Sequence, residues 1–143
     1  MIFDAGFGDL FVIRNAGNTN TFGSAGSIEY AVLDLNVRVL VVMSHQGCGA
    51  VKAAYLKEQA FSASLTELVT DIKTGLTGHG INTDDISSYD NACMRHATIT
   101  ASSLMDNSAP IRKAVHNKVL MIQPAFLHIC LLYTSDAADE CLC

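Results

Sequence analysis

Apolar residues in the first third of the chain follow two different spacings, one typical of strands and one typical of a helix. Residues 9–15 are a short, largely apolar run between glycine-containing segments, which predicts a buried strand. Ser24 can cap a helix whose apolar positions recur every three or four residues, and Asn36 suits its end. Residues 37–43 are nearly continuous valine and leucine, as in a parallel strand covered on both faces.

The rest of the chain alternates in the same way between helical spacing and strand-like runs. Helices are predicted at 50–59, at 65–76 with Gly75, Gly78 and Gly80 breaking it, at 84–107, and from Pro110 to about Asn117; a last strand is predicted at 119–122 and 125–129. Helices between strands predict an α/β fold, with a mostly parallel central β-sheet flanked by helices.

Composition favours one folded domain and excludes several classes of protein. The chain has 143 residues, of which 50% are hydrophobic and 16% charged, so it can bury a core. A net charge of −5 gives no electrostatic footprint for nucleic acid or an anionic membrane. Neither a transmembrane run nor a signal peptide is visible. We therefore expect a cytoplasmic protein, with an organellar location as the alternative.

The last residues do not follow the pattern of a folded domain. Residues 130–140 read CLLYTSDAADE, which resembles the translated sequence of a sequencing-library adapter. An apolar run there gives way to small and acidic residues without a cap or turn signal. We therefore interpret residues 130–143 as an artefactual tail and exclude them from the prediction of the fold. The five cysteines are odd in number and unevenly spaced, which is not a disulfide framework.

The strongest chemical signal follows the 37–43 strand. His45 and Cys48 stand three residues apart at its end, and Gly47 and Gly49 flank the cysteine. In open α/β sheets, ligands bind outside the carboxyl ends of strands. An imidazole and a thiolate are both zinc ligands, but a catalytic zinc normally has three protein ligands and an open fourth position. The pair predicts half of a zinc site.

Two other interpretations of this pair remain open. In the first, Cys48 is a buried cysteine beside a hydrogen-bonded histidine. In the second, Cys48 is a nucleophile and His45 its base, as in a thiol enzyme. Cys93 lies in a helical stretch and is expected to be a small core residue. The other histidines have no ligand-like spacing, so we expect core or solvated roles for them: His79, His96, His116 and His128.

Three segments carry a family resemblance. Residues 8–18 read GDLFVIRNAGN, residues 27–32 read SIEYAV, and residues 45–51 read HQGCGAV. In order and spacing they resemble motifs of the β-class carbonic anhydrases. Residues 108–111 and 119–129 are similar to the last helix and last strand of that family. The resemblance identifies residues 1–129 as a partial domain of this family.

The resemblance implies zinc-dependent, reversible hydration of carbon dioxide to bicarbonate, in a homodimer or larger even oligomer. It makes His45 and Cys48 metal ligands, and it places Asn15, Gly17, Asn18 and Gly49 around the metal as supporting residues. Glu29 and Tyr30 are expected to be helix-packing or interface residues.

Two departures from the family pattern limit what the resemblance implies. Ser44 stands where the family usually has glycine. The family's C-x-D-S-R motif, with a zinc cysteine and an Asp–Arg pair, would precede residue 1, so we expect a fragment that lacks the first strand and assign no catalytic residue. A non-enzymatic relative is the alternative function.

Overall fold

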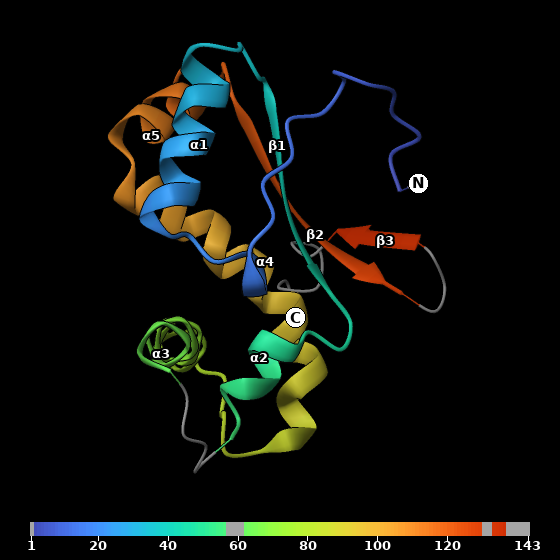
Figure 1. The fold of residues 1–143 in the computed structure, drawn as a ribbon, viewed down its shortest axis with the longest axis vertical. Helices are drawn as coiled ribbons and strands as arrows, with labels where there is room; N and C mark the ends of the chain where they lie inside the picture. The colour runs from blue at the N-terminus through green and yellow to red at the C-terminus, as the bar shows by residue number, and fades with distance from the viewer. Residues whose placement is uncertain (1, 57–61, 130–132, 137–143) are drawn as a thin grey trace.

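The sheet is small and lies against one long helix. The computed structural model describes residues 2–56, 62–129 and 133–136, and within these the strand order is β1-β2-β3 (Figure 1). Strands β1 (Val39–His45) and β2 (Met121–His128) are parallel. Strand β3 (Tyr133–Asp136) pairs antiparallel with β2. The predicted α/β class, with a parallel sheet flanked by helices, is confirmed.

The helices form two groups, one toward each end of β1 (Figure 1). They are α1 (Phe22–Leu33), α2 (Gly49–Ala53), α3 (Ala63–Gly78), α4 (Tyr89–Asn107) and α5 (Ala109–His116), with 3-10 turns η1 (Ala16–Asn18) and η2 (Ile86–Ser88). Helix α4 packs against both β1 and β2. Helices α1 and α5 lie together toward the start of β1, whereas α2 and α3 lie toward its end (Figure 1).

The start of α1 differs from the prediction by three residues. Thr21 is the N-cap, and its hydroxyl accepts a hydrogen bond from the Ser24 amide at 3.3 Å. In return, the Thr21 amide donates to the Ser24 hydroxyl at 2.8 Å. This reciprocal capping box satisfies two backbone donors, so the helix begins before Ser24. The helix ends at Leu33 rather than at Asn36, which has a φ of +65°.

The strand predicted at residues 9–15 is wrong. This segment is extended, but it pairs with no strand in the described part of the chain. Its apolar side chains are also exposed: the exposed fraction is 46% for Phe11 and 65% for Val12. A strand needs a neighbour for its backbone donors and acceptors. The apolar run alone did not reveal whether such a neighbour was present.

Smaller differences concern the other ends of elements. Helix α3 continues through Gly75, which was predicted to break it, and ends at Gly78. Helix α2 ends at Ala53, and the predicted end at residue 59 falls among residues 57–61, outside the described part. Strand β3 lies in the segment that the sequence analysis excluded, whereas the interpretation of residues 130–143 as an artefactual tail stays a prediction.

The core has two parts, one on each side of the middle of α4. One part joins α2, α3, α4 and β2 through Val51, Ile72, Leu76, Ala97 and Phe126. The other joins α1, α4, α5 and β1 through Ile28, Val42, Leu104 and Ile111. Among the described residues, no helix is both long and apolar enough to cross a membrane.

Candidate metal site at the end of β1

His45 is oriented by the peptide that follows it. It is the last residue of β1, and its Nδ1 lies 2.9 Å from the carbonyl oxygen of Gln46. A carbonyl only accepts, so Nδ1 carries the proton and donates. The lone pair is then on Nε2, which is the arrangement of a metal-binding histidine whose other ring nitrogen is held by a carbonyl. The Gln46 amide donates to the Leu127 carbonyl at 3.0 Å, which fixes this turn to β2.

Cys48 follows in a tight turn whose backbone conformation favours glycine. Gly47 has a φ of +72°, a conformation that glycine adopts without steric cost. Cys48 is the N-cap residue of α2 and is 5% exposed, and Gly49 is the first residue of that helix. The turn therefore places His45 and Cys48 at the same carboxyl end of β1, and their role as a ligand pair stays a prediction.

Two side chains from α4 contact Cys48. The Tyr89 hydroxyl donates to the Cys48 carbonyl oxygen at 2.9 Å, and it also makes a side-chain hydrogen bond with Cys93. Burial, and then the neighbouring Cys93, raise the pKa of Tyr89. Burial also raises the pKa of the Cys93 thiol, against a lowering contribution from the backbone of Cys48. Tyr89 and Cys93 are therefore neutral at pH 7 and can stabilise the turn without bringing charge to it.

Three of the four supporting residues predicted from the family resemblance lie in η1 or beside it, whereas Gly49 begins α2. Asn18 donates from Nδ2 to the Met43 carbonyl of β1 at 3.0 Å. Asn15 donates to the Thr19 carbonyl at 2.9 Å and closes the same loop. Gly17 has a φ of +66°, and a Cβ there would lie 2.9 Å from the Cδ1 atom of Ile72. The loop is thus tied to β1 and packed against α3.

The sequence analysis expected a core or solvated role for His96, and the structure places it in contact with this loop. It is buried in α4, and its Nε2 donates to the Gly17 carbonyl at 2.7 Å. Burial lowers its pKa, although the bond to Gly17 opposes that effect. The sequence analysis did not single out Tyr89. The available signal was the helical spacing of Tyr89 and His96 with Cys93, which places all three on one face of α4.

The described residues supply two candidate metal ligands rather than a full set. No group of three or more His, Cys, Asp or Glu side chains that could hold a metal occurs among them. The donor set of one imidazole and one sulfur nevertheless suits zinc. Ser44 directly precedes His45 in the sequence. Its hydroxyl is buried and has no hydrogen-bond partner among the described residues.

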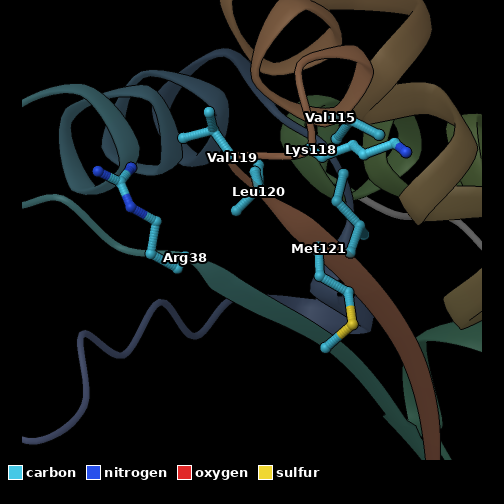
Figure 2. Close-up of a pocket in the computed structure, with 7 residues that line it drawn as sticks. Arg38, Val115, Lys118, Val119, Leu120 and Met121 are labelled. Carbon is cyan, nitrogen blue, oxygen red and sulfur yellow. The ribbon is translucent and has the colours of Figure 1, made fainter.

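A hollow of about 730 Å³ lies elsewhere, at the beginning of β1 and β2 (Figure 2). Its walls are mainly apolar, with Val115, Leu120 and Met121 among them. Arg38 and Lys118 point away from each other in Figure 2, so their charges do not converge on one ligand. This hollow is at the end of the strands opposite His45, and it has no part in the candidate metal site.

Comparison with known proteins agrees with the fold and the motifs. The carbonic anhydrase family model matches residues 1–130. Carbonic anhydrase 2 of Mycobacterium tuberculosis is 36% identical over 126 residues, which are 85% of this chain and 59% of that protein. The carbonic anhydrase of Mycolicibacterium smegmatis is 53% identical over 53 residues, covering 37% of this chain and 26% of that protein.

Solved structures give the same answer for the fold. One of the tetrameric β-carbonic anhydrases of the ascomycete Sordaria macrospora superposes with a TM-score of 0.76 and 26% identity, over 94% of this chain and 71% of that chain. The Coccomyxa β-carbonic anhydrase, solved with acetazolamide, has a TM-score of 0.72 at 20% identity and supports the fold alone, over 94% of this chain and 64% of that chain.

The chain belongs to the β-class carbonic anhydrase family, which confirms the resemblance in the sequence. It spans 59% of the length of the Mycobacterium tuberculosis relative.

Proposed function

We propose that this carbonic anhydrase relative catalyses the reversible hydration of carbon dioxide to bicarbonate, with His45 and Cys48 as two ligands of a zinc ion. The observation that carries the proposal is the His45 ring, whose Nδ1 proton is held by the Gln46 carbonyl at 2.9 Å. This bond leaves Nε2 as the nitrogen with a lone pair for a metal. The remaining ligands come from outside the described residues.

The proposed chemistry divides between the ion and the chain. At such a site zinc would lower the pKa of a bound water to about 7, which would provide hydroxide at neutral pH. The chain's own contribution is to hold the imidazole of His45 in one orientation and to bury the sulfur of Cys48. Gly47 and Gly49 allow the tight turn between them. Asn15, Gly17 and Asn18 support the adjacent loop, and we assign no catalytic acid or base to this chain.

Metal titration tests the ligand pair. Cobalt(II) replaces zinc as a spectroscopic probe, since a bound thiolate gives a sulfur-to-metal charge-transfer band. We expect His45→Ala and Cys48→Ser each to weaken cobalt binding by at least about tenfold, because losing a ligand should cost no less than losing a supporting contact. His116→Ala removes an exposed histidine as the control. Unchanged affinity in both site variants would refute the ligand assignment.

The reaction is tested separately. Stopped-flow hydration of carbon dioxide is measured on the zinc-loaded gene product that contains this chain, with Cys48→Ser as the paired variant. A lower rate in the variant is expected, and equal rates contradict the proposed activity in favour of a non-enzymatic relative. If zinc fails to protect Cys48 from alkylation, the Cys–His thiol enzyme becomes the better hypothesis.

We further propose that this chain associates with a second copy of itself. Large apolar side chains remain exposed on the segment before η1 and on α1: Phe7, Leu10, Phe11, Val12, Phe22, Tyr30 and Leu33. Phe11 and Tyr30 join the two parts, with ring centroids 6.4 Å apart. An apolar surface that extends over two segments is typical of an oligomer interface. The Sordaria macrospora relatives are described as tetrameric.

Sedimentation analysis tests this association. Leu33→Glu places a charge on the α1 surface, where Leu33 is 61% exposed. Ile86→Glu makes the same kind of change in η2, where Ile86 is 62% exposed, and serves as the matched control. We expect only Leu33→Glu to shift the protein toward the monomer. An equal effect of both changes, or of neither, would count against this surface.

A further inference from the structure

One face of α4 carries a row of polar side chains that contact the candidate metal site from behind. Tyr89, Cys93 and His96 follow each other at intervals of four and three residues, which places them on one side of a helix. Tyr89 and Cys93 contact Cys48, and His96 contacts Gly17. Helix α4 therefore reaches both loops at the end of β1.

The two loops also depend on each other through β1. Asn18 in the first loop donates to the Met43 carbonyl, two residues before His45. In the second loop, the Gln46 amide is bonded to Leu127 of β2. Helix α4 packs against both of these strands. A contact from α4 thus fixes each loop relative to the strand that presents His45.

The contacts from α4 differ from ordinary core packing in their chemistry. Both Tyr89 and His96 donate to backbone carbonyl groups, those of Cys48 at the N-cap of α2 and of Gly17 in η1. Tyr55, which packs edge-on against Tyr89 with ring centroids 5.9 Å apart, directs its hydroxyl to Ser88 instead. Two tyrosines of the same cluster therefore have different hydrogen-bond partners, and only Tyr89 contacts a proposed ligand.

We infer that Tyr89 is a positioning residue for the metal-binding turn, and that His96 has the same role for the loop around Gly17. This inference rests on the proposed function, because it treats Cys48 as a metal ligand. By holding the Cys48 carbonyl, Tyr89 restricts the backbone that carries the sulfur. A ligand restricted before the metal arrives loses less conformational freedom on binding, so the contact increases metal affinity.

The matched pair Tyr89→Phe and Tyr55→Phe tests this role. Each variant removes one hydroxyl from the same cluster, so both are expected to lose similar stability. We expect Tyr89→Phe to weaken cobalt binding by about threefold to tenfold and to change the charge-transfer band, the size that follows from one lost hydrogen bond. Tyr55→Phe should leave both unchanged. Equal cobalt affinities in the two variants would overturn the inference.

A second measurement separates this inference from the proposed function. Amide hydrogen exchange of residues 45–50 requires no metal, and we expect faster exchange in Tyr89→Phe than in Tyr55→Phe. If the unchanged protein binds no cobalt, the proposed ligand pair fails, and the exchange result alone decides whether Tyr89 holds the turn. Equal exchange in both variants would refute that.

His96 is tested by a conservative replacement. His96→Gln retains a side-chain donor for the Gly17 carbonyl, whereas His96→Leu removes it. Cobalt affinity near that of the unchanged protein in His96→Gln, with weaker binding in His96→Leu, supports positioning through the hydrogen bond. Equal loss of cobalt affinity in both variants would refute positioning through the hydrogen bond, because the shape of the imidazole alone would then explain the effect.

Discussion

A substitution at Gly17 tests whether the loop beside the candidate site requires a glycine at this position. Its φ is +66°, and a Cβ there would meet the Cδ1 atom of Ile72 at 2.9 Å and the Cβ atom of Ala50 at 3.2 Å. Ile72 is 1% exposed, so its side chain has little room to move away. Gly17→Ala therefore combines an unfavourable backbone conformation with overpacking between α2 and α3.

The two costs can be estimated separately. A left-handed conformation costs a residue with a Cβ about 1–2 kcal/mol. Overpacking a well-packed core costs about 1–3 kcal/mol. We expect Gly17→Ala to lower the free energy of unfolding by about 2–5 kcal/mol, a large part of the stability of a small domain. Urea unfolding followed by circular dichroism measures this change.

Two other glycines make the experiment decisive. Gly47 has a φ of +72° but open space around a Cβ, so Gly47→Ala should show only the backbone cost. Gly26 lies inside α1 with open space and no unusual φ, so Gly26→Ala should stabilise the protein by about 0.5–1 kcal/mol. If Gly17→Ala and Gly47→Ala prove equally destabilising, the contact with Ile72 contributes nothing and the reasoning from packing is refuted.

Three further predictions concern a helix cap, a buried histidine and a contact between helices. Thr21→Ala removes the capping box shared with Ser24 and should cost about 1 kcal/mol of unfolding free energy in urea; a change below a few tenths would contradict the role of the cap. Because the folded pKa of His96 is lowered, the unfolded state binds its proton first. The contribution of His96 to the free energy of unfolding is therefore complete above pH 6.5. It falls as the pH drops, by at most about 1.4 kcal/mol per pH unit. Urea unfolding measured over a range of pH would refute this if His96→Gln showed the same loss. Ser108 caps α5 and donates to the Glu29 carboxylate of α1 at 2.6 Å, so Ser108→Ala should cost about 1–3 kcal/mol in urea unfolding, and an unaffected midpoint would contradict it.

A strand could be predicted from the sequence where its apolar composition agrees with the elements that pack against it in the structure. The apolar run at 37–43 became β1, at residues 39–45, where β2 pairs with it and α4 packs against it; its alternating burial does not match the predicted cover on both faces. The run at 9–15 is also apolar in its middle but has no strand beside it in the described residues, and the sequence carries no local signal for the missing neighbour. Strand pairing depends on distant residues, so short apolar runs specify it poorly.

The candidate site was predictable only in part for a related reason. His45 and Cys48 are close in sequence, so their spacing was enough to pair them. Tyr89 and His96 contact residues 41 and 79 positions away, respectively, and no local pattern encodes such contacts. Their helical spacing shows that they share a face of α4, but what that face contacts depends on the packing of α4 against the sheet.

The pairing of β1 with β2 has a consequence for the order of folding. Residues 46–120 separate the two strands, so the parallel pair closes a long loop and forms slowly compared with the local helices between them. During synthesis, His45 leaves the ribosome well before Leu127, the residue that holds the Gln46 amide. The candidate metal-binding turn therefore becomes fixed only when nearly all of the described chain has been made, and the proposed metal capture should follow translation rather than accompany it.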